Sequence, residues 1–88
     1  MNSEQSLIEY PSDFPIKVFG ESNDDFTRVV TEIISQHDPN FNASGIEIRN
    51  SKNARYISLT CTVRATSREQ LDMIYQALCA HPLVKMAL

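Results

Sequence analysis

Residues 55–65 have the sequence RYISLTCTVRA, in which apolar and polar side chains alternate over the whole length. Because successive side chains of a β-strand point to opposite sides, this period of two predicts a strand with one buried side. The side chains expected to be buried are Ile57, Leu59, Cys61, Val63 and Ala65. The side chains expected to face solvent are Tyr56, Ser58, Thr60, Thr62 and Arg64.

Three shorter stretches predict further strands around this one. They are Phe14–Gly20, Gly45–Asn50 and Leu83–Leu88. The turn-forming residues Ser51–Ala54 separate the second of them from residues 55–65, so these two strands should form a hairpin. In the two short strands we expect the inward-facing side chains to be Ile46, Ile48, Val84, Met86 and Leu88.

Two stretches have apolar residues at the spacing of an amphipathic helix. The first follows Ser22–Asp25, whose side chains can accept hydrogen bonds from a helix start, and it should stop near His37 because Pro39 disfavours helical backbone before it. The second begins with a capping box in which Ser67 is the cap and Gln70 its reciprocal partner. The apolar positions of the two helices are Phe26, Val29, Val30, Ile33, Ile34, Leu71, Ile74, Tyr75 and Leu78.

The order strand–helix–strand–strand–helix–strand is that of an α+β, ferredoxin-like domain. Right-handed crossovers place both helices on one face of a four-stranded antiparallel sheet and leave the other face open. We therefore predict a flexible N-terminal tail over residues 1–13 and a single domain over residues 14–88. Its core should contain Ile16, Val18, Val29, Val30, Ile33, Ile48, Leu59, Cys61, Val63, Leu71, Ile74, Leu78 and Met86.

Composition limits the functions open to a chain of 88 residues. A formal net charge of -3 argues against non-specific binding to nucleic acid or to an anionic membrane, because both rely on basic protein surface. The first residues are polar, and no apolar run approaches the roughly 20 residues of a membrane span. We therefore expect a cytoplasmic protein without a membrane partner.

Catalytic, cofactor and metal motifs are missing from the sequence. Cys61 and Cys79 lie far apart with no Cys/His cluster around them, which favours two reduced thiols in the core. The turn Gly20–Asp25 holds three carboxylates and would repel a phosphate group. No spacing joins a nucleophile, a base and an orienting group. We therefore expect no enzymatic activity, no cofactor and no bound metal.

Residues spread over nearly the whole chain resemble a known family. They are Leu7–Pro11, Phe14, Lys17, Val18, Gly20, His37, Pro39, Ser51, Lys52, Tyr56, Ser58, Ala65, Thr66, Tyr75 and Val84–Leu88. Their order and spacing are similar to those of the YbeD-like family of uncharacterised small bacterial proteins. The resemblance implies a ferredoxin-like fold similar to that of ACT regulatory domains, which bind small effectors such as amino acids and usually work as pairs. It implies no enzymatic activity.

The turn after the first strand departs from the ACT pattern. ACT domains usually place a turn with proline and glycine there, whereas here Glu21, Ser22 and Asn23 follow Gly20 without a proline. If a small ligand binds at this turn, the candidate ligand-binding residues are Gly20, Glu21, Ser22 and Asn23.

Two functions remain open at this point. The first is a non-catalytic, ACT-like regulatory or adaptor domain that acts through a protein partner, a small effector or a second copy in a homodimer. The alternative is a nucleic-acid-binding module that uses the open sheet face. The predicted alternation gives that face four basic residues against one acidic residue, Glu47. The candidate partner-binding residues are Lys17, Phe19, Arg49, Tyr56, Ser58, Arg64 and Lys85.

Overall fold

Two long strands form the centre of the sheet in the computed structural model, which describes residues 9–88. Strand β3 (Tyr56–Ala65) is the one predicted from residues 55–65, and β1 (Ser12–Glu21) runs antiparallel beside it. The two are paired along their whole length, from Ser12 opposite Ala65 to Glu21 opposite Tyr56. Pairing of this extent places every second side chain of both strands on the same side of the sheet.

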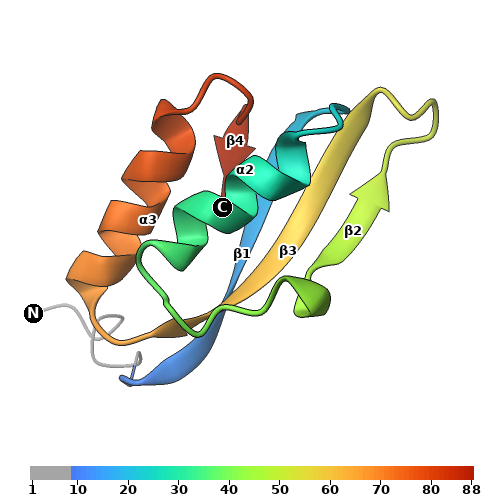
Figure 1. Ribbon diagram of the computed structural model, residues 1–88. Coiled ribbons are helices and arrows are strands. Elements are labelled where there is room, and N and C mark those ends of the chain that lie inside the picture. The colour runs from blue at the N-terminus through green and yellow to red at the C-terminus, as the bar shows by residue number, and fades with distance from the viewer. Residues whose placement is uncertain (1–8) are drawn as a thin grey trace, which may run out of the picture.

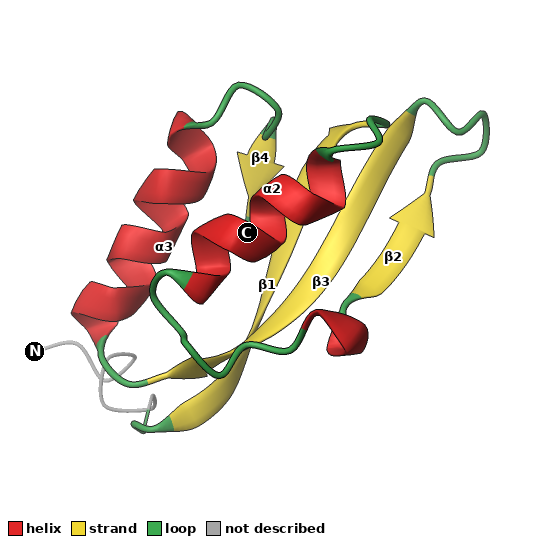
Figure 2. Cartoon of the chain, viewed as in Figure 1, coloured by secondary structure: helices red, strands yellow, loops and turns green. Residues whose placement is uncertain are grey.

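Two short strands complete an antiparallel sheet in the order β2-β3-β1-β4. Strand β2 (Glu47–Asn50) lies outside β3, and β4 (Met86–Ala87) lies outside β1. Helices α2 (Phe26–Ser35) and α3 (Arg68–Ala80) cover one face of this sheet, as Figures 1 and 2 show. A single 3₁₀ turn, η1 (Ala43–Gly45), precedes β2. The predicted α+β, ferredoxin-like architecture is confirmed.

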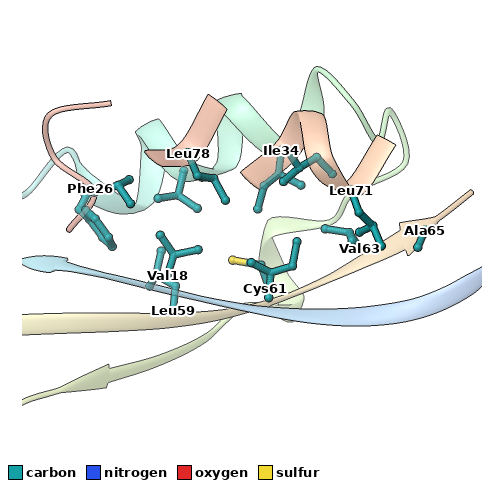
Figure 3. Packing of buried hydrophobic residues seen from close by; sticks show 13 residues of the cluster. Val18, Phe26, Ile34, Leu59, Cys61, Val63, Ala65, Leu71 and Leu78 are labelled. Atoms are coloured by element: carbon teal, nitrogen blue, oxygen red, sulfur yellow. The ribbon is translucent and has the colours of Figure 1, made fainter. Parts of the chain in front are cut away.

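The core lies between the two helices and the face of the sheet that they cover. Val18 and Leu59 point from adjacent strands towards Phe26 and Leu78 on the helices (Figure 3). The side chains of this cluster are almost entirely buried, and they are Ile16, Val18, Phe26, Val30, Ile34, Leu59, Cys61, Val63, Ala65, Leu71, Ile74, Leu78 and Val84. Most of the predicted core is therefore confirmed, with Ile33 partly buried at its margin.

The start of α3 confirms half of the predicted capping box. The Ser67 hydroxyl oxygen accepts a hydrogen bond from the Gln70 backbone N–H (3.0 Å). The Gln70 side chain does not reach back to Ser67 as predicted. Its oxygen accepts from the Thr66 N–H (2.7 Å), and its amide nitrogen donates to the carbonyl of His37 (2.8 Å). Because His37 follows α2, this side chain joins the two helices.

Two predicted core residues are exposed, and each has a geometric reason. Ile48 lies opposite Leu59 on the helix side of the sheet, but it is 53% exposed. The reason is that α2 covers β1 and β3 and does not reach over β2 (Figure 1). Met86 was expected inside, but it pairs with the outward-facing Phe19 and is 46% exposed. Ala87, opposite Val18, takes the inward position.

The N-terminal boundary of the domain also differs from the prediction. Ser12 and Asp13 belong to β1, although the sequence placed them in a tail. They extend the strand because they pair with Ala65 and Arg64, at the far end of β3. Residues 1–8 of the predicted tail lie outside the described part of the chain.

The two cysteines have different surroundings. Cys61 is buried under the helices, as predicted, and this burial raises the pKa of its thiol to about 12. Cys79 is exposed, so the prediction that it belongs to the core was wrong. It follows the buried Leu78 on α3, and a helix turns about 100° per residue, which carries the next side chain off the buried face.

Replacing Leu59 with Ala should lower the free energy of unfolding by about 2–5 kcal/mol, because it removes a fully buried side chain and leaves a cavity. Urea unfolding followed by circular dichroism measures this loss. Met73→Ala is the matched control, since Met73 is 53% exposed on α3 and should change stability little. Similar small losses in both variants would show that the core is not where the structure places it.

Thiol titration at pH 8 should separate the two cysteines. The thiolate is the reactive form, and the raised pKa of Cys61 keeps that thiol protonated at this pH. A disulfide reagent should therefore modify one thiol rapidly in the folded protein and the second only in denaturant. Cys79→Ser should remove the rapid phase. Two rapid equivalents in the folded wild type would contradict the burial of Cys61.

Candidate functional site

The face of the sheet opposite the helices carries two rows of side chains that cross all four strands. Paired residues of antiparallel strands share a side of the sheet, so the register defines each row. The first row consists of Arg49, Ser58, Phe19 and Met86. The second consists of Glu47, Thr60, Lys17 and Leu88, where Lys17 and Leu88 exchange two backbone hydrogen bonds (2.8 and 2.9 Å). We call these eight residues the open-face rows.

Apolar side chains are exposed on these rows. Met86 is 46% exposed and Leu88 60% exposed, next to the partly exposed Phe19. The sequence interpretation missed Met86 and Leu88 because it continued the alternation from Val84. Val84 is instead buried within a turn, where its N–H donates to the carbonyl of His81 (3.0 Å). Only the pairing with β1 sets which side Met86 faces, so no local signal could have found it.

Two hollows adjoin each other on this face and share Phe19, Arg49 and Ser58. One, of about 250 Å³, extends to Tyr56 at the hairpin end of β3. The other, of about 400 Å³, extends to Lys17, Glu47 and Thr60. The structure thus brings together five of the seven predicted partner-binding residues, which are Lys17, Phe19, Arg49, Tyr56 and Ser58.

The other two predicted partner-binding residues lie elsewhere. Arg64 is at the opposite end of β3, where its guanidinium forms an ion pair with Asp13 (3.2 Å) and lines a separate hollow beside Asp38. Lys85 lies just before β4, at the margin of the sheet, with its ammonium 3.9 Å from the Glu21 carboxylate. Neither side chain contributes to the hollows centred on Phe19.

The open face carries more acidic residues than predicted, so the predicted ratio of four basic residues to one acidic residue was wrong. Because β1 extends from Ser12 to Glu21, it adds two carboxylates to this face, opposite Arg64 and Tyr56. By register, the basic residues of the face are Lys17, Arg49 and Arg64, and the acidic ones are Asp13, Glu21 and Glu47. Two further cations lie next to it, since the Arg55 guanidinium is over the Tyr56 ring (5.6 Å) and the Lys85 ammonium is beside Glu21 (3.9 Å).

Two of the basic side chains have no ion pair within the described part of the chain. The exposed ion pairs of the sheet involve Arg64 and Lys85, and such pairs contribute little to stability. Lys17 and Arg49 have no carboxylate within 4 Å among residues 9–88. Their charges remain available to an external group next to exposed apolar surface.

The turn predicted to bind a small ligand has a structural reason for its glycine. Gly20 is buried, and a Cβ atom there would overlap the Phe26 ring and the carbonyl oxygen of Leu83. Glycine therefore permits close packing of β1 against α2 and the segment before β4. The exposed residues Glu21, Ser22 and Asn23 line a hollow of about 110 Å³, below the 300–1,000 Å³ of typical ligand pockets.

The described residues hold neither a metal cluster nor a membrane span. No group of three or more His, Cys, Asp or Glu side chains in residues 9–88 is arranged to hold a metal ion. Within the same range, each helix is too short or too polar to cross a lipid bilayer.

Comparisons with other proteins agree on the family of this chain. The family model described as "Protein of unknown function (DUF493)" matches residues 5–88. A UPF0250 protein of Bordetella pertussis is 55% identical over 85 residues, covering 97% of this chain and 93% of its own. A UPF0250 protein of Nitrosomonas europaea is 54% identical over 86 residues, covering 98% and 99% respectively.

One solved structure has the same fold. The solution structure of protein HP0495 from H. pylori superimposes with a TM-score of 0.77 at 22% sequence identity, covering 100% of this chain and 94% of that one. The resemblance found in the sequence is therefore confirmed over the full length. This chain belongs to the DUF493/UPF0250 family, the YbeD-like group of small bacterial proteins.

Proposed function

We propose that this protein is a non-catalytic, ACT-like regulatory or adaptor domain of the bacterial cytoplasm that binds a protein partner on its open sheet face. The observation that carries the proposal is the combination found on the open-face rows. Exposed Met86 and Leu88 lie beside Phe19, and the same two rows hold Lys17 and Arg49, which form no ion pair within residues 9–88. Mixed apolar and charged surface of this kind is typical of protein interfaces.

The shape of the surface favours a protein segment over a small effector. The two hollows adjoin each other across β2, β3 and β1, and the one that extends to Tyr56 is open to solvent, whereas effector pockets enclose most of their ligand. An extended segment could cover Phe19 and Met86 with an apolar side chain. A carboxylate on the same segment would then reach Lys17 or Arg49 and gain a charge-assisted hydrogen bond.

Nucleic acid fits this face less well. Binding to a phosphate backbone depends on a surplus of basic side chains, and Asp13, Glu21 and Glu47 place three carboxylates on this face. Phe19 and Tyr56 could stack on bases, but the Arg55 guanidinium already lies over the Tyr56 ring (5.6 Å), and Glu47 in the same hollow as Phe19 would repel a phosphate. Nucleic acid is therefore an outcome to be tested rather than the proposed partner.

Affinity capture from extract of the native bacterium, with the wild type and a Lys17→Glu/Tyr56→Ala variant as baits, tests the proposal. The variant reverses an unpaired charge and removes an exposed ring at two points of the same face. Each protein captured by the wild type is then titrated with both baits. The variant should bind it roughly tenfold or more weakly than the wild type does, a loss of about 1.4 kcal/mol in binding free energy. Added salt should weaken the wild-type complex more than the variant complex.

Arg68→Glu is the matched control, because it also replaces a cation with a carboxylate, at an exposed position of α3 on the other side of the sheet from both hollows. This control should bind the captured partner as the wild type does. Equal binding by the Lys17→Glu/Tyr56→Ala variant, with its fold intact by circular dichroism, would sink the proposal. Capture that disappears after nuclease treatment would replace it with nucleic-acid binding.

A further inference from the structure

The outer edge of β2 is unpaired within the described part of the chain. β2 is the first strand in the sheet order, and β3 is its one neighbour there. An exposed strand edge is a template for pairing with another chain, and many proteins block it with proline or a bulge. Here the edge carries neither within Glu47–Asn50, and it presents the 53% exposed side chain of Ile48.

The backbone groups of Ile48 and Asn50 point outward along this edge. Ser51 donates its N–H to the carbonyl of Tyr56 (2.9 Å), so these two residues form a hydrogen-bonded pair. Hydrogen-bonded and non-hydrogen-bonded pairs alternate along an antiparallel ladder. The N–H and C=O groups of Ile48 and Asn50 therefore point away from β3. The C=O of Ile46 points the same way, while its N–H bonds to Ala43 (3.1 Å).

The side chains of this strand are complementary to a second copy of themselves. Glu47 and Arg49 flank Ile48 symmetrically, and both face the open side of the sheet. If two β2 strands pair antiparallel with Ile48 opposite Ile48, each Glu47 lies opposite an Arg49 of the other copy. Opposite charges at such cross-strand positions stabilise the pair, and like charges destabilise it.

Only the register centred on Ile48 places Glu47 opposite Arg49 and also keeps the helices of both copies on the same side of the sheet. Centring the pair on Glu47 would place two carboxylates opposite each other, and centring it on Arg49 would place two guanidinium groups there. A register shifted by one residue would put the helices of the two copies on opposite sides of the sheet.

From this complementarity we propose that the protein forms a two-fold homodimer by antiparallel pairing of β2 with β2. The two sheets join into one, with all helices on one side. The two Ile48 residues exchange two backbone hydrogen bonds, and each Asn50 N–H donates to an Ile46 carbonyl of the other copy. The open-face rows of both copies then form one continuous surface, with two Glu47–Arg49 pairs at its centre.

Charge reversal across the two-fold axis provides a sharp test by sedimentation velocity over a range of concentrations of the full chain. Glu47→Arg alone or Arg49→Glu alone turns two attractive pairs into two repulsive ones, so each variant should dimerise roughly tenfold or more weakly than the wild type. An equimolar mixture of the two single variants should recover dimers as heterodimers. The double variant Glu47→Arg/Arg49→Glu should dimerise as the wild type does.

A backbone variant tests the same edge without changing charge. Ile48→Pro removes the N–H that would bond to the other copy, and this N–H takes no part in the β2–β3 ladder, so the fold should persist. This variant should be monomeric where the wild type is dimeric, with an unchanged circular dichroism spectrum. If that spectrum changes, the sedimentation of the Glu47 and Arg49 charge-reversal variants is the test of the dimer.

Lys17→Glu separates this proposal from the proposed function. Lys17 lies on β1, two strands away from the edge, so the substitution should weaken partner binding and leave dimerisation unchanged. A wild type that stays monomeric at every concentration would overturn the dimer. So would dimers that resist both single reversals, or single variants that fail to recover dimers when mixed.

Discussion

The pairing of β1 with β3 is the constraint on which the rest of the structure depends. It runs from Ser12–Ala65 to Glu21–Tyr56 without a break, so it aligns the inward side chains of both strands under the helices. Val18 and Leu59, for example, face each other at the centre of the core. A slip of one residue would expose every one of these side chains, and the buried apolar surface therefore holds the register strongly.

The same register produces the candidate binding surface. Once Val18 and Leu59 are buried, Phe19 and Ser58 must face the other way, beside each other. Each edge strand is then attached by its own pairing, which adds Arg49 on one side and Met86 on the other. The open-face rows are therefore a consequence of core packing, although they contribute little to it. Their mixture of apolar and unpaired charged groups is what a binding role would explain.

The two edges of the sheet differ in what they offer a partner. At one edge β4 consists only of Met86–Ala87. Lys85, just before this strand, forms an ion pair with Glu21. At the other edge β2 presents outward backbone groups. Glu47 and Arg49 flank Ile48 there, so an antiparallel second copy would place opposite charges next to each other. A dimer through β2 would engage Glu47 and Arg49 of the open-face rows and leave Phe19, Lys17 and Met86 free for a different partner.

The sequence by itself determined the element order, the fold class, most of the core and five residues of the candidate site. These follow from local periodicity, because the alternation in 55–65 and the apolar stripes of the two helices require no knowledge of their neighbours. It could not determine where Met86 or Ile48 lie, because Met86 takes its side from the pairing with β1 and Ile48 is exposed where α2 does not cover β2. Cys79 is different, since its place one helical step beyond Leu78 is a local property that the prediction of a core thiol overlooked.

Only the tertiary structure decided the charge of the open face. Asp13 and Glu21 join that face because β1 pairs with β3 to the ends of both strands, and this pairing has no signature in the local sequence. The role of Gly20 is also a tertiary property, since the Phe26 ring and the Leu83 carbonyl that exclude a side chain come from different segments. Local pattern predicts which residues can be buried, and contacts between distant segments decide which of them are.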